Sequence, residues 1–472
     1  MKRKINNFLL IIILLIGLIF LSFSCGDTGM QDLEKTSPVS ISGVILRKNS
    51  TEIFIGSTEQ LIALLEPSDA ADQSVSWTTD NENIAAVDSS GLVTGISEGT
   101  AAITVTTTDG GYTDTCEVTV QKIWTASQSG SAETAGSSVT YTNNQDNFSF
   151  TLKACPGGTF PTGVDDNGDI SGFDTLSVDS PAAVTSFWIG ETEVTYELWY
   201  TVRDWAENTA SPSYTFRYSG REGNDGTLGA SPSDVDQEPV TVITWRDVMI
   251  WCNALTEYYN ASKDFELNCV YYTDDGYTAP IRAVDNSETV SWEEGPGPND
   301  GSQDDPYIKA DANGFRLLTS NEWELAARWR DDDGNTVEGY TSPWFTTGNS
   351  ASGATTWYKD AVDESGDPAK SANDLVAVYQ DYWDGSDWAW TGVNNTAEVK
   401  TKAANTLGLY DMSGNVQEWC FDWYPGDEGS YRVRRGGGKD SSATYLQVGF
   451  PYRGNPYGAG SEIGFRVSRS PD

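Results

Sequence analysis

The side chains that most often carry out catalysis in proteins are scarce in this chain. Its 472 residues include no histidine, which excludes Ser-His-Asp and Cys-His catalysis, the HExxH zinc site and histidine-based proton transfer. The six cysteines are Cys25, Cys116, Cys155, Cys252, Cys269 and Cys420. Since no two of them stand at CxxC spacing, a zinc knuckle and a thioredoxin-type redox motif are excluded as well.

Cys25 follows a segment typical of a secretory signal. Three basic residues precede an apolar run over residues 8–21, and Ser22-Phe23-Ser24 lead into the cysteine. The run is too short to span a bilayer comfortably. The cysteine resembles that of a bacterial lipobox, which implies a lipoprotein signal peptide over residues 1–24 and acylation of Cys25; plain cleavage and an uncleaved anchor are the alternatives. We therefore expect a cell-envelope protein, held to the membrane by its lipid and exposed at the cell surface.

The composition is that of an acidic, folded protein. The formal net charge is −40, and residues 1–24 contribute only positive charge to it. A surface of this sign repels nucleic acid, which we do not expect as a partner. Aromatic residues make up 12% of the chain, which argues against disorder. The length predicts two or three domains.

Residues 38–121 show the pattern of a small all-β domain. Short strands are predicted within this range, and the last two are joined through the turn signal Asp109-Gly110-Gly111. Apolar residues alternate with polar ones, so one face of each strand should be buried, with Cys116 pointing inward. The order SW, IAAVD, GLVTG, GTAAITV resembles the bacterial Ig-like group 2 (BIG2) family, which implies a β-sandwich. A spacer role is favoured over a binding role.

The flanking segments are predicted to lack regular structure. Residues 25–37 are polar and non-periodic, which is typical of a tether. Residues 122–147 are rich in Gly, Ser, Thr and Asn and are predicted to be a linker.

Two helices are indicated in the C-terminal part. Thr244 and Asp247 frame a helix start, after which apolar residues follow helical spacing. Thr319 and Glu322 form a capping box ahead of Trp323. The rest of this part is irregular and rich in Gly, Asp, Asn and Trp, so ordered loops pinned by buried aromatic residues are expected.

Ordered motifs in residues 148–472 carry a family resemblance. They include Pro156-Gly157-Gly158-Thr159-Phe160, Phe187-Trp188-Ile189-Gly190-Glu191, Gly314-Phe315-Arg316-Leu317-Leu318, Asn321-Glu322-Trp323-Glu324, Ser413-Gly414-Asn415-Val416-Gln417-Glu418-Trp419, Arg435-Gly436-Gly437 and Gly464-Phe465-Arg466. In this order they resemble the formylglycine-generating, sulfatase-modifying factor family. The resemblance implies an α+β variant of the C-type lectin fold with little regular secondary structure.

The family's catalytic cysteines are missing. In active members two cysteines, five positions apart and just downstream of an RGGSW motif, bind copper, which soft thiolates hold well. Starting from Arg435-Gly436-Gly437, these positions fall on Ser441 and Leu446, and no cysteine follows Cys420. We therefore expect no copper and no enzymatic activity.

The resemblance also implies a calcium site. The family's ligands map to Asp411, Gly414, Val416 and Glu418, and oxygen ligands from a tight loop suit Ca²⁺ in a structural role. Alternatively, Asp411 and Glu418 only cap and hydrogen-bond a tight turn.

Residues 438–462 mix small, polar and aromatic residues without helical or strand period, a composition used by adaptable binding loops. The alternative is an ordinary surface loop, which composition alone would favour. The C-terminal frame resembles treponemal variable lipoproteins diversified by retroelements, which place a C-type lectin fold on the cell surface. In that class the ligand-binding positions would be Lys439, Asp440, Ser441, Ser442, Tyr445, Gly449, Phe450, Tyr452, Gly454, Tyr457 and Gly458.

The leading hypothesis is therefore a lipoprotein that binds an extracellular protein or glycan without catalysis. One alternative is an enzyme of the same family with altered chemistry, which the lack of histidine to hold iron disfavours. The other is a purely structural envelope protein.

Overall fold

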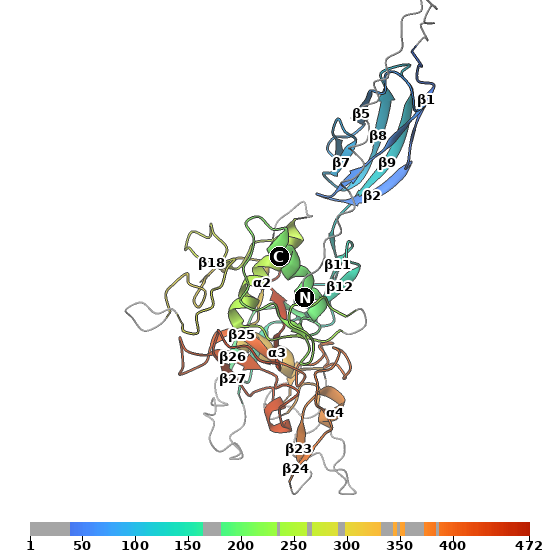
Figure 1. The fold of residues 1–472 in the computed structure, drawn as a ribbon. Helices are drawn as coiled ribbons and strands as arrows, with labels where there is room; N and C mark the ends of the chain where they lie inside the picture. The colour runs from blue at the N-terminus through green and yellow to red at the C-terminus, as the bar shows by residue number, and fades with distance from the viewer. Residues whose placement is uncertain are drawn as a thin grey trace, which may run out of the picture.

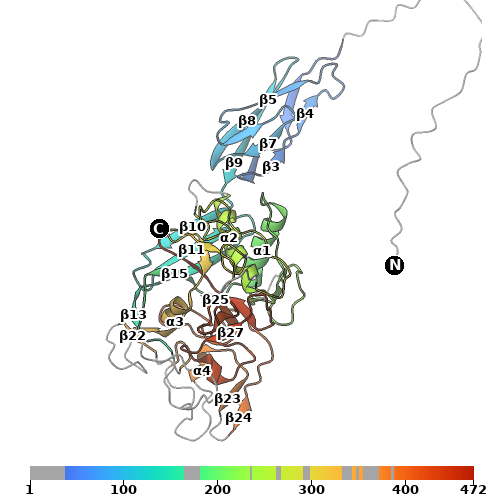
Figure 2. The same ribbon diagram turned by 90° about the vertical axis from the view of Figure 1, so that its left-hand side faces the viewer.

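The computed structural model describes residues 38–163, 181–233, 237–261, 267–290, 298–331, 343–346, 350–354, 372–383 and 387–472. The predicted signal peptide, Cys25 and the predicted tether lie outside these residues. An elongated β-domain stands at one end of the molecule, and a larger, loop-rich domain follows it (Figures 1 and 2).

The first domain is a β-sandwich, as predicted. Its strands are β1 Gly43–Leu46, β2 Ser50–Phe54, β3 Thr58–Gln60, β4 Ala63–Glu66, β5 Val75–Thr79, β6 Ala85–Val87, β7 Leu92–Gly95, β8 Gly99–Thr107 and β9 Thr113–Gln121. They form sheets β2-β9-β8-β5 and β3-β7-β6 and the pair β1-β4. Alternate residues of β8 and β9 are buried, among them Ile103, Cys116 and Val118, and pack on Val93 of the other sheet. Burial raises the pKa of the Cys116 thiol.

The predicted linker over residues 122–147 is wrong. Only Lys122 and Ile123 separate β9 from β10 (Trp124–Ser129), which pairs with β11 (Ser138–Asn143). Polar residues fill the outward positions of β11, while Val139 and Tyr141 are buried. The Gly- and Ser-rich composition of this segment thus reflects an exposed turn and the solvent-exposed face of a sheet. The second domain begins at Trp124.

A six-stranded sheet forms the base of the second domain, in the order β10-β11-β12-β15-β29-β20. Its further strands are β12 Phe148–Cys155, β15 Phe187–Gly190, β20 Phe315–Leu317 and β29 Val467–Arg469. The last strand of the chain therefore lies between two much earlier ones, which closes the domain.

The second sheet has four strands in the order β27-β26-β25-β28. Its members are β25 Gln417–Trp423, β26 Arg432–Arg435, β27 Tyr452–Gly454 and β28 Ile463–Phe465. Short pairs complete the strands: β13 Gly158–Phe160 with β14 Ala182–Val184, β16 Arg221–Glu222 with β17 Val240–Thr241, β18 Tyr271–Tyr272 with β19 Tyr307–Ile308, β21 Trp329–Arg330 with β22 Trp344–Phe345, and β23 Asp381–Trp383 with β24 Trp388–Trp390.

The described residues contain four α-helices and a 3₁₀ turn: α1 Tyr196–Asn208, α2 Trp245–Asn260, α3 Ser320–Arg328, α4 Ala372–Val376 and η1 Ala443–Leu446. Both predicted capping boxes are confirmed, at Thr244 of α2 and Thr319 of α3. Within the described part of the chain, no helix is both long enough and apolar enough to cross a membrane.

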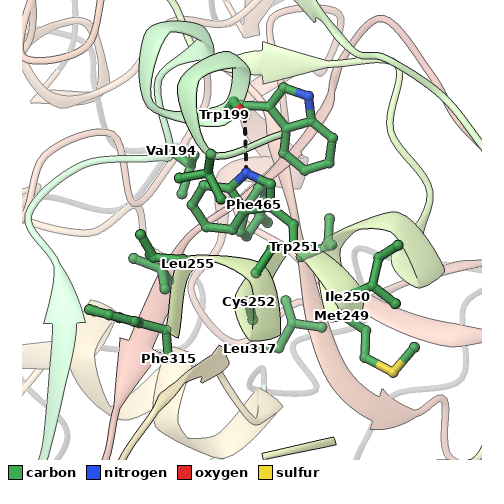
Figure 3. Packing of buried hydrophobic residues seen from close by; sticks show 14 of the residues in the cluster. Val194, Trp199, Met249, Ile250, Trp251, Cys252, Leu255, Phe315, Leu317 and Phe465 are labelled. Atoms are coloured by element: carbon green, nitrogen blue, oxygen red, sulfur yellow. Dashed lines mark hydrogen bonds between the residues drawn. The ribbon is translucent and has the colours of Figure 1, made fainter. Parts of the chain in front are cut away.

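The core of the second domain is built around α2, which is buried along most of its length. Trp251 stacks on Trp199 of α1 with ring centroids 5.7 Å apart, and its indole N–H donates to the Trp199 carbonyl at 3.1 Å (Figure 3). Phe465 of β28 meets the Trp251 ring edge-on at 5.2 Å. Because β28 is a strand of the second sheet, this packing fixes that sheet relative to the helices.

Candidate ligand-binding site

The segment after β26 turns sharply at two glycines. Gly436 and Gly437 have φ of 91° and 71°, a region that side chains other than glycine rarely adopt. A Cβ on Gly437 would also lie 2.7 Å from the Tyr445 carbonyl oxygen. The turn therefore requires these glycines, and it leads the chain into η1 and then back into β27.

Ser441 and Leu446, where the family resemblance predicts the copper-binding cysteine positions, are built into the fold. The Ser441 hydroxyl accepts from the backbone N–H of Gly438 at 3.0 Å, and the Ser441 N–H donates to the Gly438 carbonyl at 2.8 Å. Leu446 is 0% exposed and packs in a cluster with Val376 and Tyr379. Ser441 therefore closes a turn, and Leu446 fills a core position.

The eleven predicted ligand residues divide into buried and accessible ones. The buried members are Lys439, Ser441, Gly449, Phe450 and Gly454. The members that reach the surface at least partly are Asp440, Ser442, Tyr445, Tyr452, Tyr457 and Gly458. The accessible residues are therefore the ones that a ligand could touch directly.

The glycines are buried because large groups lie against them. A Cβ on Gly454 would come within 2.6 Å of the Trp419 ring, and one on Gly449 within 2.1 Å of the Gly163 carbonyl oxygen. These two positions therefore serve packing in this fold.

Three aromatic residues of the segment form one cluster. The ring of Tyr452 lies 5.1 Å from that of Phe450 and 5.7 Å from that of Tyr445, and the latter two are 5.6 Å apart. The Tyr452 hydroxyl donates to the Tyr445 carbonyl at 3.2 Å, and burial raises the pKa of this phenol. Because Phe450 is buried beneath two half-buried tyrosines, the cluster presents a firmly supported aromatic surface.

Tyr457 is held from a different element. Its ring lies 5.6 Å from the guanidinium carbon of Arg246 in α2, and the Arg246 N–H donates to the Pro456 carbonyl at 3.4 Å. Arg246 is itself fixed by a buried ion pair with Asp304 at 2.7 Å. Tyr457 and Gly458 therefore extend the accessible surface toward the start of α2.

The four predicted calcium ligands lie on one loop and the strand after it. Asp411 is 3% exposed and has φ of 56°; its Oδ2 accepts from the Lys400 N–H at 2.9 Å, and its Oδ1 has no partner among the described residues. Burial raises the pKa of this carboxyl. An orphaned carboxylate oxygen of this kind suits a cation.

Glu418 fits a cation less well. Arg466 pairs with its Oε1 at 2.9 Å, and the Trp323 indole donates to its Oε2 at 2.8 Å. The Val416 N–H donates to Glu193 at 3.1 Å. Across the described residues, no three acidic or cysteine side chains form a metal-binding group. Calcium at these positions stays a prediction.

The cysteines of the second domain offer no reactive thiolate. Cys155, Cys252, Cys269 and Cys420 are free and buried. Burial raises the pKa of each thiol, and a nucleophilic or metal-binding cysteine requires the opposite shift.

The architecture therefore defines a class: an Ig-like module joined directly to a loop-rich α+β domain of the sulfatase-modifying factor type. Residues 143–471 match the Sulfatase-modifying factor enzyme 1-like domain, so this chain belongs to that family. Residues 40–118 match the Bacterial Ig-like domain (group 2). Both predicted family memberships are confirmed.

Several known proteins are similar to the chain. The chaperone protein LppX of Paenibacillus barcinonensis is 27% identical over 348 residues, which cover 72% of this chain and 96% of the relative. The formylglycine-generating enzyme of Thermomonospora curvata is 26% identical over 190 residues, 36% of this chain and 54% of the enzyme. Among solved structures, Treponema denticola variable protein 1 has 27% identity and a TM-score of 0.42, covering 73% of this chain and 99% of that one.

Proposed function

We propose that this protein is a cell-envelope lipoprotein whose sulfatase-modifying-factor-like domain binds an extracellular ligand and catalyses no reaction. The observation that carries the proposal is the use of the two former cysteine positions. Ser441 closes a turn and Leu446 fills a core. Without thiolates at these positions the segment cannot bind copper in the family's manner.

The aromatic cluster supports a role in recognition. Tyrosine offers a large contact area at low cost in side-chain entropy, and it is enriched in binding surfaces. Tyr445 and Tyr452 are half-buried, with Phe450 packed against both. Their rings are therefore partly ordered before a ligand arrives, which reduces the entropy lost on binding.

A protein ligand is favoured over a glycan. The relative LppX, which aligns with 72% of this chain, is named a chaperone protein, and that name points to a protein ligand. The predicted lipid at Cys25 would place the Ig-like domain between the membrane and the binding domain. In Figures 1 and 2 the Ig-like domain stands at one end, and η1, α4 and the β23-β24 pair lie toward the other.

Binding arrays test the proposal. The full-length chain, purified in detergent, is applied to arrays of secreted and matrix proteins and of glycans, beside a Tyr445→Ala/Tyr452→Ala double variant. Tyr112→Ala, which removes an exposed aromatic ring from the Ig-like domain, is the matched control. We expect hits that the double variant loses and the control keeps. No hit, or hits indifferent to the two tyrosines, would contradict the proposal.

A further inference from the structure

Trp390 at the end of β24 is an exposed aromatic side chain beside the candidate site. It is 58% exposed, although burial of a tryptophan is strongly favourable. Its indole N–H donates to the Val393 carbonyl at 3.2 Å. Since this hydrogen bond satisfies the polar atom and holds the ring, the exposed area is the apolar, electron-rich ring.

Strand pairing connects Trp390 to the predicted ligand residues. Trp390 pairs with Asp381 across the β23-β24 ladder, and Asp381 forms a parallel bridge with Ser442. The Gln380 N–H donates to the Ser441 carbonyl at 2.8 Å, and the Thr391 N–H donates to the Gln380 carbonyl at 2.8 Å. The β23-β24 pair is therefore hydrogen-bonded to the segment that leads into η1.

Paired residues carry their side chains on the same face of a sheet, with Cα atoms about 5 Å apart. Trp390, Asp381 and Ser442 therefore form a row of an aromatic ring, a carboxylate and a hydroxyl, which we call the hairpin row. Within the described residues, no hydrogen bond or ion pair engages the Asp381 carboxylate. Ser442 begins η1 without a side-chain cap hydrogen bond. All three groups are thus available to a partner.

We propose that the hairpin row receives a lysine or arginine side chain of a protein partner. The inference rests on the proposed function and names the chemistry of its ligand. The face of a tryptophan ring attracts cations, and a carboxylate adds a charge-assisted hydrogen bond. Ser442 supplies a further acceptor at the end of the row.

The charges around the row agree with a basic partner. Asp387 in the same hairpin and Asp440 next to the row are both exposed acids. Lys439, a cation near the row, is 5% exposed and pairs with Asp440 at 2.6 Å. With a net charge of −40 for the whole chain, approach of a positive surface is favoured at long range.

A phage-displayed library of random dodecapeptides, panned against the full-length chain in detergent, tests the inference. We expect selected peptides to carry lysine or arginine. Their affinity should fall about tenfold with Trp390→Ala and about three- to fivefold with Asp381→Asn. Tyr112→Ala and Asp311→Asn, which alter an exposed ring and an exposed acid elsewhere, should leave affinity unchanged. Affinity should also weaken between about 0.05 M and about 0.5 M NaCl, because salt screens exposed charges.

The outcomes separate this inference from the proposed function. Peptides that depend on Tyr445 and Tyr452 but not on Trp390 would overturn the inference and leave the proposed function standing. If binding of a neutral oligosaccharide requires Trp390 and no basic peptide is selected, the proposal of a protein partner is overturned. No binding in either the library or the arrays would overturn both.

Discussion

Replacement of Leu446 by alanine tests whether this position, where the family resemblance predicts a copper-binding cysteine, is part of the core. Leu446 is fully buried, in a cluster with Ala351, Val376 and Tyr379. Truncation removes three apolar carbons and leaves a cavity, and such Leu→Ala changes cost about 2–5 kcal/mol. We expect about 3 kcal/mol at this site.

Urea unfolding followed by tryptophan fluorescence measures the effect. Trp77 is the only one of the 17 tryptophans within residues 38–121, so the signal reports mainly on the second domain. With a denaturant slope of about 3 kcal/mol/M for a domain of this size, the unfolding midpoint should fall by about 1 M.

The neighbouring Tyr445 provides the contrast. Since Tyr445 is half-buried, Tyr445→Ala should cost only about 1 kcal/mol and should chiefly reduce ligand binding. The reasoning is refuted if the Leu446→Ala midpoint stays within about 0.2 M of wild type, or if Tyr445→Ala is the more destabilising change.

Other predictions concern contacts that hold the domain in place. Glu324→Gln should destabilise the second domain by about 3–5 kcal/mol, because Glu324 is the buried partner of Arg435 at 2.8 Å; a midpoint equal to wild type in urea would contradict this. Asn144→Ala should loosen the domain junction, since it removes the side-chain amide that donates to the Lys122 carbonyl at 2.9 Å; small-angle scattering should show a broader size distribution, and an unchanged profile would count against a fixed junction. Burial disfavours the Glu322 carboxylate, but the Arg316 ion pair outweighs burial and lowers the Glu322 pKa. The resulting stability is present above the unfolded pKa of about 4.3 and is lost as pH falls through the lower folded value. Glu322→Gln should therefore make the free energy of unfolding fall less steeply with decreasing pH in the acidic range, and an equally steep fall would refute this.

Local signals were readable from the sequence. The capping boxes of α2 and α3 involve residues only three positions apart, so the sequence predicts them without knowledge of the fold. The pairs are Thr244 with Asp247 and Thr319 with Glu322. The sandwich strands were recognisable because alternation reports burial of one face.

Packing between segments far apart in the chain could not be predicted from the sequence. Strands β10 and β11 carry many polar residues, so their composition predicts a linker. Nothing local shows that Val139 and Tyr141 meet a core formed by residues far along the chain. Among the candidate site residues, burial of Gly449 and Gly454 depends on Gly163 and Trp419. The pairing of Asp381 with Ser442 likewise joins segments about sixty residues apart. The alternating Trp388-Ala389-Trp390 motif is a local signal from which the strand of the hairpin row could have been predicted.

Hydrogen exchange of the full-length chain, with and without the strongest binder from the arrays, tests the central claim most directly. Recognition by the segment that contains Ser441 and Leu446 predicts slowed exchange of backbone amides over residues 440–452, and also at the β23-β24 pair if the hairpin row takes part. Slowed exchange confined to the Ig-like residues 38–121, with none over residues 440–452, would contradict the account.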